Sequence, residues 1–449
     1  MPESGGRRRG RTIAAVATAP GRSGIAIIRI SGPDARPALE RLVGTRDFAP
    51  RLARLHRFND PVTGNPIDEG LALWFPAPAS FTGEDVVELQ VHGSRAVTAA
   101  LLKVLVESSG IALAEPGEFT RRAFDNGKLD LTQVEALADL IDAETEGQRR
   151  QALRQLDGAL GVRAETWREE LIRASAFLEA AIDFPDEDLP ADTHARAAPV
   201  IGRIASEMNA MLNDNHAAER MRDGVTIAIV GPPNAGKSTL LNALAKRDVA
   251  IVSEHAGTTR DVLELGLDLG GIPVVLLDTA GLREAEEPVE QEGVRRARSR
   301  AESADLRVVL WEASRAPVDS QSLGIAVRPD DILVYSKLDL APLHTLEARA
   351  IGISATSGQG MAQLIAALGS AAARKVSSGS DAAVTRARHR QELVRATDAL
   401  SQALAVDASL PELMAEQVRA ACNALGRITG RIDVEDILDV VFAEFCLGK

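Results

Sequence analysis

The sequence predicts a multidomain α/β protein with a small N-terminal α+β domain, a helical bundle domain, and a doubly wound domain inserted into the helical one. Three observations predict it. Residues 224–370 alternate β-rich runs with helical patterns, as in a mostly parallel sheet covered on both faces. Helical periodicity precedes this segment, from Asp130, and resumes after it, from Thr385. Before Asp130, β-rich runs are bounded by glycine and proline.

The composition is that of an ordinary globular protein. The chain has 449 residues, 45% hydrophobic and 26% charged, which suggests about three domains of roughly 150 residues. Two cysteines exclude a disulfide framework and fit a reducing compartment, so we expect a cytoplasmic location. There is no apolar run of about 18 residues, and we expect no membrane association. The net charge of −13 argues against indiscriminate binding of nucleic acid.

The expected domain boundaries follow the changes of pattern. The parts are a basic, disordered tail (1–11), the α+β domain (12–125), the first part of the helical domain (126–222), the inserted domain (223–372) and the second part of the helical domain (373–449). The basic tail lacks the apolar core of a signal peptide. Bundles of antiparallel helices usually serve as scaffolds, so chemistry is expected in the other two domains.

The expected elements can be placed by pattern. Strands are expected at 12–17, 24–30, 71–75 and 86–91 in the first domain and at 225–230, 262–269, 274–277, 306–311, 332–335 and 350–353 in the inserted one. Helices are expected at 96–107, almost unbroken from 142 to 184, and at 194–222, 385–406, 411–425 and 434–445. Arg29 and Glu88 interrupt apolar strands of the first domain, and on composition alone each is expected to face solvent.

Residues 231–238, Gly-Pro-Pro-Asn-Ala-Gly-Lys-Ser, match G-x-x-x-x-G-K-[ST] between a β-rich run and a helical pattern. Gly231 and Gly236 let the backbone wrap a phosphate with its N–H groups pointing inward. The helix that begins there adds its positive end. We expect Lys237 to reach the outer phosphates and the Ser238 hydroxyl to bind magnesium.

Four further segments follow in the order of a GTPase. Thr259 of 257–261 could complete the magnesium shell, and 278–281 would bring Asp278 to the metal and Gly281 to the γ-phosphate. Asp339 of 336–339 could accept two hydrogen bonds from guanine that adenine cannot match, and 354–356 suits backbone contact with the guanine oxygen. The expected GTP contacts are Asn234, Ala235, Gly236, Lys237, Ser238, Thr239, Ser253, Glu254, His255, Ala256, Gly257, Thr258, Thr259, Asp278, Thr279, Ala280, Gly281, Ser336, Lys337, Leu338, Asp339, Ser354, Ala355 and Thr356.

Two positions depart from the Ras-like pattern. Ser336 stands where asparagine is usual, and its single short hydroxyl is expected to brace the base and the neighbouring loop less, which predicts a somewhat weaker affinity for GTP. Leu282 stands where Ras-like enzymes carry the glutamine that orients the attacking water. Residues 283–292 offer five glutamates as replacements, and composition cannot choose among them.

The motifs together resemble the MnmE (TrmE) family of tRNA-modification GTPases over essentially the whole chain after the basic tail. The resemblance rests on residues 21–24, 28–32, 81–88, 116–124, 231–239, 253–261, 278–284 and the terminal Phe-Cys-Leu-Gly-Lys at 445–449. It implies an N-terminal folate-binding and dimerisation domain, a helical domain and an inserted G domain. Members form homodimers and work with the FAD-containing partner MnmG as a heterotetramer, so no flavin is expected on this chain.

The resemblance also implies an activity. Together the two proteins install an aminomethyl-type group, often carboxymethylaminomethyl, on carbon 5 of the wobble uridine of certain tRNAs. A tetrahydrofolate derivative (5-formyl- or 5,10-methylene-tetrahydrofolate) supplies one carbon. GTP hydrolysis drives a conformational cycle in which the G domains meet across the dimer, with potassium and magnesium at the nucleotide.

The resemblance implies roles residue by residue. The water-orienting glutamate is Glu290, and magnesium is bound through Ser238 and Thr259. Potassium is bound by the side chain of Asn234 and by backbone carbonyls of Ser253, His255 and Thr258. The folate residues are Arg29, Glu88, Lys128 and Lys449, and the implied functional thiol is Cys446.

Several alternatives stay open. The sequence shows no histidine or basic partner beside Cys446, so a structural role and a role as nucleophile are equal alternatives for this residue. Cys422 is expected in a core. For the whole protein, the alternatives are an RNA-binding or ribosome-assembly GTPase switch without modification activity, and a regulatory protein that uses GTP to move a helical scaffold.

Overall fold

The computed structural model describes residues 10–183, 193–214, 216–251, 264–278, 299–315, 326–340, 349–377, 383–407 and 410–432, together with Leu438, Val441, Phe442, Phe445 and Gly448. The chain forms two compact units. The first contains Met1–Ala138 and Gly426–Lys449, and the second contains Asp139–Leu425. Among the described residues, no helix has both the length and the apolarity needed to span a membrane.

The first unit is built on a six-stranded sheet in the order β3-β4-β5-β2-β1-β6. Its strands are β1 (Ile13–Val16), β2 (Ser23–Ser31), β3 (Arg54–Asn59), β4 (Pro66–Phe75), β5 (Val86–Gly93) and β6 (Ala112–Leu113). All neighbours are antiparallel except the parallel pair β1–β6. The expected strands are confirmed, and the structure adds β3 and β6.

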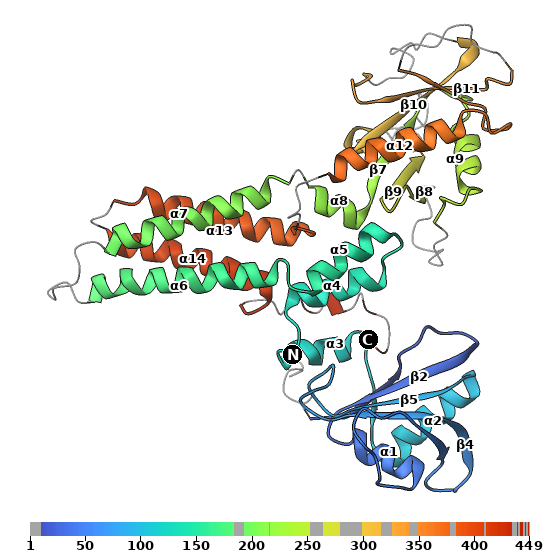
Figure 1. The fold of residues 1–449 in the computed structure, drawn as a ribbon, viewed down its shortest axis with the longest axis vertical. Coiled ribbons are helices and arrows are strands. Elements are labelled where there is room, and N and C mark those ends of the chain that lie inside the picture. Colours follow the sequence, from blue (N-terminus) through green and yellow to red (C-terminus); the bar gives the residue numbers. More distant parts are fainter. Residues whose placement is uncertain are drawn as a thin grey trace, which may run out of the picture. The chain divides into compact units, whose positions relative to one another are not determined.

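Helices α1 (Ala35–Val43) and α2 (Arg95–Ser109) cover one face of this sheet (Figure 1). Ile28 and Ile30 on β2 and Leu89 on β5 are fully buried in the core beneath these helices. Since successive strand residues point to opposite faces, the intervening Arg29 and Glu88 lie on the other face. Of these two helices, only α2 was expected.

On the second face, α3 (Glu118–Asp125) places Phe119 in a small core with Ile13 and Ala15 of β1. Helix α4 (Leu131–Ile141) follows α3 in the chain. The expected helix at 434–445 lies mostly outside the described residues, but Leu438, Val441, Phe442 and Phe445 pack against α4 through Leu131, Val134 and Ala138. The C-terminal segment therefore belongs to the core of the first unit.

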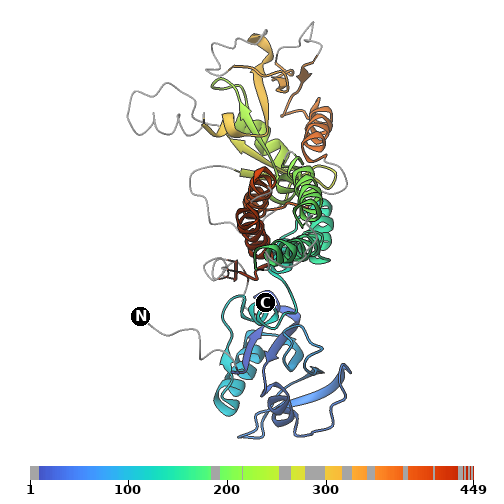
Figure 2. The same cartoon turned by 90° about the vertical axis from the view of Figure 1, so that its left-hand side faces the viewer.

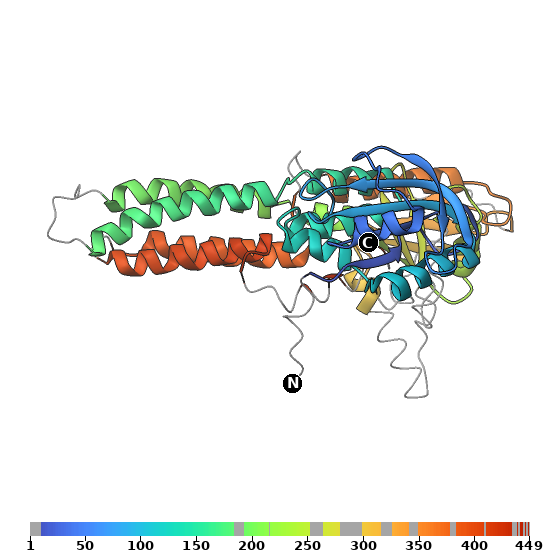
Figure 3. The same ribbon diagram turned by 90° about the horizontal axis from the view of Figure 1, so that it is seen from below.

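The second unit contains a helical bundle and an α/β domain. The helices are α5 (Glu146–Leu156), α6 (Gly161–Asp183), α7 (Thr193–Leu212), α8 (Ala217–Asp223), α13 (Ala387–Ala405) and α14 (Pro411–Thr429). Helices α6, α7, α13 and α14 form the bundle, seen nearly end-on in Figure 2 and in two layers in Figure 3.

Two expected helices are broken. The stretch expected to run almost unbroken from 142 to 184 is α5 and α6, because Gly158 adopts φ +93° in the turn between them. The helix expected at 194–222 is α7 and α8, separated by a turn at His216 with φ +59°. Left-handed backbone cannot continue a right-handed helix, so both predictions of continuity were wrong.

The α/β domain has a sheet in the order β12-β11-β10-β7-β9-β8. The strands are β7 (Val225–Val230), β8 (Glu264–Asp268), β9 (Pro273–Asp278), β10 (Leu306–Glu312), β11 (Ile332–Ser336) and β12 (Ile351–Gly352). All pairs are parallel except β8–β9. Ile227 and Ile229 face a core with α9 (Lys237–Ala245) and α12 (Met361–Val376), whereas Ala228 and Val230 face the opposite core. This confirms the predicted doubly wound fold.

Candidate functional site

The predicted phosphate loop joins β7 to α9 through a tight turn. Gly236, the residue before α9, has φ +95°, and Asn234 has φ +62°. A Cβ on Gly231 would lie only 2.2 Å from the carbonyl oxygen of Leu310 on β10. Glycine is therefore required at Gly231 by the close approach of two strands, and at Gly236 by its left-handed backbone.

Lys237 is the first residue of α9. Its Nζ donates to the carbonyl oxygens of Gly231, at 2.8 Å, and Pro232, at 3.1 Å. The ammonium group therefore lies over the concave side of the loop, next to the N-terminus of a helix. Both features favour a bound anion at this position.

The ends of four parallel strands bring the motifs to one edge of the sheet. In the strand register Ile229 of β7 is paired with Asp278 of β9, and Glu312 of β10 is paired with Ser336 of β11. Because ligands of open α/β sheets bind outside the carboxyl ends of the strands, this edge is the candidate nucleotide site.

Ser336 is 5% exposed and lies beneath the phosphate loop. Its Oγ is 2.6 Å from the carbonyl oxygen of Ala235 and 3.2 Å from that of Trp311. The sequence predicted that this serine braces the neighbouring loop less than asparagine does. The structure shows a short hydrogen bond from the serine to that loop, between residues 101 positions apart, which no local pattern reveals.

The next residue, Lys337, adopts φ +61° and its Nζ forms an ion pair with Glu312 at 3.1 Å. Hydrogen bonds from Ser314 and Lys337 lower the pKa of Glu312, so this carboxyl group stays ionised at neutral pH. The backbone N–H of Leu338 donates to the carbonyl oxygen of Ile353 at 3.2 Å. These contacts fix the turn that presents the exposed Asp339.

The loop expected to contact the guanine oxygen begins at Ser354, which is fully buried. The N–H of Ser354 donates to the carbonyl oxygen of Gln359, and the N–H of Gly358 donates back to the carbonyl oxygen of Ser354, both at 2.9 Å. Ala355 and Thr356 lie within this closed turn, directly before α12. Their backbone groups are therefore held in a fixed geometry.

Several predicted site residues lie outside the described part of the chain. They are Ser253, Glu254, His255, Ala256, Gly257, Thr258, Thr259, Thr279, Ala280, Gly281, Glu290, Cys446 and Lys449, together with Leu282. Among the described residues, Ser238 and Asn234 are exposed and carry a hydroxyl and an amide oxygen, the type of ligand that hard cations such as magnesium accept. These two residues therefore fit a hard cation at the phosphate loop.

The predicted folate residues Arg29 and Glu88 face each other across β2 and β5. Two guanidinium nitrogens of Arg29, Nε and Nη2, donate to one oxygen of Glu88 at 3.0 and 2.8 Å. The side chains are only 23% and 19% exposed, so the expectation that each simply faces solvent was wrong. The Arg29 guanidinium also lies 5.6 Å from the ring centre of Phe81 and 5.8 Å from that of Phe119.

Gly448 lies at the same place. Its carbonyl oxygen is 3.5 Å from Nη1 of Arg29, and a Cβ on it would lie 2.3 Å from the carbonyl oxygen of Val16. Gly448 has φ +93°, so glycine is required by both space and backbone. Lys128, another predicted folate residue, donates from Nζ to the carbonyl oxygen of Pro78 at 3.2 Å.

Cys422 lies half-buried on α14, with its Sγ 4.0 Å from the carbonyl oxygen of Arg168. Burial raises the pKa of this thiol to about 11. At neutral pH almost none is thiolate, so Cys422 is a poor nucleophile.

Two family models match the chain. Residues 12–128 match the GTP-binding protein TrmE N-terminus, and residues 131–446 match the MnmE helical domain. The tRNA modification GTPase MnmE of Parvibaculum lavamentivorans is 56% identical over 444 residues, which cover 98% of this chain and 100% of that protein. The chain belongs to the MnmE family.

Other MnmE proteins show the same extent of similarity. The tRNA modification GTPase MnmE of Rhodopseudomonas palustris (strain BisB18) is 51% identical, with 98% of this chain and 99% of the relative covered. That of Bradyrhizobium sp. (strain ORS 278) is 53% identical, with 95% and 96% covered. The protein is therefore a GTP hydrolase that acts in tRNA modification, and the predicted MnmE resemblance is confirmed.

Proposed function

We propose that this protein is a potassium-dependent GTPase that, with an FAD-containing MnmG partner, forms the carboxymethylaminomethyl or aminomethyl group at carbon 5 of the wobble uridine of certain tRNAs. The one-carbon unit comes from a tetrahydrofolate derivative bound by this chain. The active form is a homodimer within a heterotetramer in the cytoplasm. Membership of the MnmE family supports this proposal.

The observation that carries the modification role is the convergence of Arg29, Glu88 and Gly448 in the first unit. A carboxylate with free lone pairs beside a guanidinium can accept from the amidine-like edge of a pterin, while the guanidinium donates to a carbonyl or carboxylate. Phe81 and Phe119 supply aromatic faces next to Arg29. These residues therefore fit a folate ligand, with Lys128 and Lys449 proposed as the cations for its acidic tail.

In the nucleotide site, Lys237 and the N-terminus of α9 bind the phosphates, and Asp339 recognises guanine. Ser238 and Thr259 are proposed to ligate magnesium. Asn234, with carbonyl groups of Ser253, His255 and Thr258, is proposed to ligate potassium, whose positive charge would do the work that other GTPases assign to an arginine finger. Glu290 is proposed to orient the attacking water in place of the glutamine that Leu282 replaces.

The proposed function is tested by measuring the modification of the wobble uridine in tRNA. In a strain that lacks the gene, mass spectrometry of purified tRNA should show loss of the carbon-5 modification, and the full chain should restore it. Normal modification in the deletion strain, with a defect confined to ribosomal subunits, would instead support a ribosome-assembly GTPase.

A variant without Leu447–Lys449 distinguishes the contribution of the proposed folate site from that of the proposed nucleotide site. It should hydrolyse GTP at nearly the rate of the full chain, because the proposed nucleotide residues all lie elsewhere, and it should not restore modification. Modification by this variant at the full rate would contradict the proposed folate site.

A further inference from the structure

Helix α5 forms hydrogen bonds to both segments that connect the α/β domain to the helical bundle, one leading into β7 and the other returning to α13. Its residues Gln148, Gln151 and Gln155 are three and four positions apart and therefore share one face of the helix. Each donates its side-chain amide to a backbone carbonyl: Gln148 to Arg222 and Gln151 to Ala218, both at 2.9 Å, and Gln155 to Ala383. Ala218 and Arg222 lie on α8, which leads into β7, and Ala383 lies on the return to α13. We call these three glutamines the α5 stripe.

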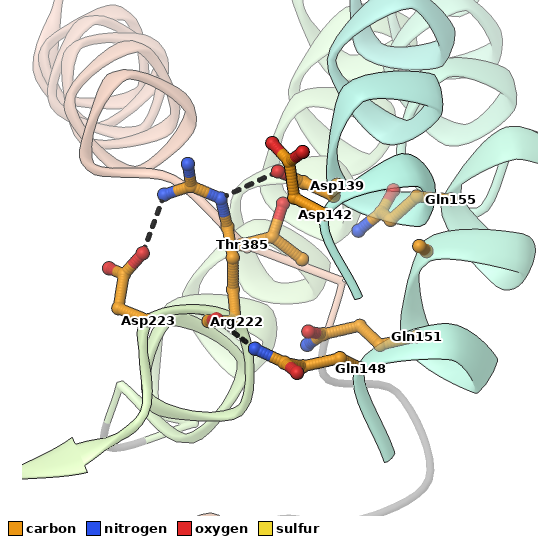
Figure 4. Close-up of a pocket in the computed structure, with 9 residues that line it drawn as sticks. Asp139, Asp142, Gln148, Gln151, Gln155, Arg222, Asp223 and Thr385 are labelled. Carbon is orange, nitrogen blue, oxygen red and sulfur yellow. Dashed lines mark hydrogen bonds and ion pairs between the residues drawn. The ribbon is translucent and has the colours of Figure 1, made fainter. Parts of the chain in front are cut away.

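A single carboxylate ties the same two connections together. Asp139 of α4 accepts a hydrogen bond from Nε of Arg222 at 2.8 Å and from Nη2 of Arg386 at 2.7 Å. Arg222 also donates from Nη1 to Asp223 at 2.7 Å (Figure 4). Arg222 therefore has two carboxylate partners, one on α4 and one on its own helix.

A third contact joins α5 directly to the sheet. The N–H of Gly147, in the first turn of α5, donates to the carbonyl oxygen of Gly271 at 2.9 Å. A Cβ on Gly147 would lie 2.3 Å from that oxygen and 2.6 Å from Sδ of Met221. Only glycine permits this approach, because backbone atoms cannot give way as a flexible side chain can.

Gly271 lies in the hairpin between β8 and β9, and the other ends of these strands lead to the nucleotide site. Asp268 is paired with Pro273 at the hairpin, whereas Glu264 is paired with Leu277 at the far end. Asp278, one of the predicted γ-phosphate and magnesium residues, follows Leu277, and the segment carrying Thr259 precedes β8. A hydrogen-bonded pair of strands moves as a unit, so a displacement at Asp278 reaches Gly271.

The contact region also has room for a second arrangement. A pocket of about 110 Å³ is lined by the α5 stripe together with Asp139, Arg222 and Asp223 (Figure 4). Gln155 is 3% exposed, and no described residue donates a hydrogen bond to its Oε1. Oε1 of Gln155 is therefore a buried acceptor that is available to another donor, and Arg222 can bond to either of two carboxylates. Hydrogen bonds in this region can be exchanged without leaving a donor unpaired.

We propose that α5 transmits the nucleotide state of the α/β domain to the helical bundle, with Gly147 and the α5 stripe as positioning residues. The β8–β9 hairpin moves α5, and α5 moves α6, which begins only five residues after α5 ends. The proposal rests on the GTP-driven modification proposed above and names the physical contact through which GTP hydrolysis acts.

The test replaces Gly147 by alanine. Gly147→Ala should lower the modified tRNA formed per GTP hydrolysed by about tenfold, within the usual range of coupling between sites, and this ratio takes account of any change in the rate of GTP hydrolysis itself. The matched control is Gly202→Ala in α7, where a new Cβ meets only Cδ1 of Leu404 at 3.9 Å. The control should keep the wild-type ratio.

A second variant guards against misfolding of the first. Gln151→Met keeps the volume and the helix propensity of residue 151 but removes its hydrogen bond to Ala218, and it should lower the same ratio. A wild-type ratio in both variants would overturn the proposal.

Hydrogen exchange separates failure of this proposal from failure of the proposed function. In the wild-type protein, exchange in residues 146–156 should differ between GDP and GDP with aluminium fluoride, and Gly147→Ala should abolish the difference. No difference in the wild-type protein would overturn the role of α5, whether or not tRNA is modified. A difference in a protein that modifies no tRNA would leave α5 as the transmitting helix and refute the modification role.

Discussion

The hydroxyl of Ser336 is 2.6 Å from the carbonyl oxygen of Ala235, so the proposed guanine-recognition segment supports the proposed phosphate loop directly. Ser336→Ala removes this buried hydrogen bond, worth about 1 kcal/mol, and should weaken GTP binding roughly fivefold. Titration with a fluorescent guanine nucleotide measures the effect. Ser303→Ala, which removes an exposed hydroxyl bonded to Arg300, should change nothing. Equal dissociation constants for Ser336→Ala and the wild type would show that the bond does not support binding.

Asp339→Asn should reverse nucleotide preference. The asparagine amide mismatches guanine but matches xanthine, whose exocyclic oxygen accepts where guanine donates. Two hydrogen bonds to a charged group are worth about 1.5–3 kcal/mol each, so GTP binding should weaken on the order of 100-fold while xanthosine triphosphate binding strengthens. Competition between the two nucleotides measures the change. Unchanged discrimination would refute the role of Asp339.

Replacing potassium by sodium at constant ionic strength should slow GTP hydrolysis. Up to about 10³-fold in kcat is expected, the lower end of what an arginine finger supplies. Asn234→Ala should show the low rate in either salt, because its amide oxygen is the proposed side-chain ligand. Full turnover of the wild-type protein in sodium would argue against the potassium site.

Asp331→Ala should destabilise the α/β domain strongly. Arg307 on β10 pairs with Asp331, and both side chains are 2% exposed. Removing one partner of a buried pair leaves the other charge uncompensated, at a cost of about 3–5 kcal/mol. Hydrogen exchange in β10 measures the loss. The control is Asp47→Ala, which breaks the exposed pair with Arg54 and should change stability by no more than about 1 kcal/mol. A similar effect of both variants would contradict the argument.

Cys422 should react slowly with iodoacetamide at pH 7.5. Because burial raises the pKa of its thiol to about 11, the thiolate fraction increases about tenfold per pH unit until that value is approached. Peptide-resolved mass spectrometry measures the rate for Cys422 separately from that for Cys446. A rate that levels off below pH 9 would contradict the raised pKa.

The α/β domain was the most predictable part of the fold. Its buried strands contain continuous apolar runs, as at 227–230 and 308–311, because Ile227 and Ala228 face different cores and both are buried. The edge strand β3 was missed because Arg54, His56 and Arg57 leave it too polar to stand out. The turn at Gly158 did have a signal, since Asp157-Gly158 is a turn dipeptide, but the surrounding amphipathic pattern outweighed it.

The site was predictable where chemistry is local and not where it depends on the tertiary fold. The phosphate loop and Asp339 follow from motif spacing alone. The pairing of Arg29 with Glu88 depends on the register of β2 and β5, 59 residues apart, and the contacts of Ser336 depend on the packing of β11 beneath the phosphate loop. Neither the α5 stripe nor Gly147 has a local signal, because glutamine and glycine become informative only through what they contact.

The position of Gly448 has a practical consequence for protein production. A peptide fused after Lys449 would be separated by that one residue from a glycine that is packed against Val16 and lies beside Arg29. A purification handle there would emerge at the proposed folate site and compete with the ligand for space, even where GTP hydrolysis is normal. Handles are better placed before the basic N-terminal segment, and preparations tagged at the other end should be compared with untagged protein before any loss of tRNA modification is interpreted.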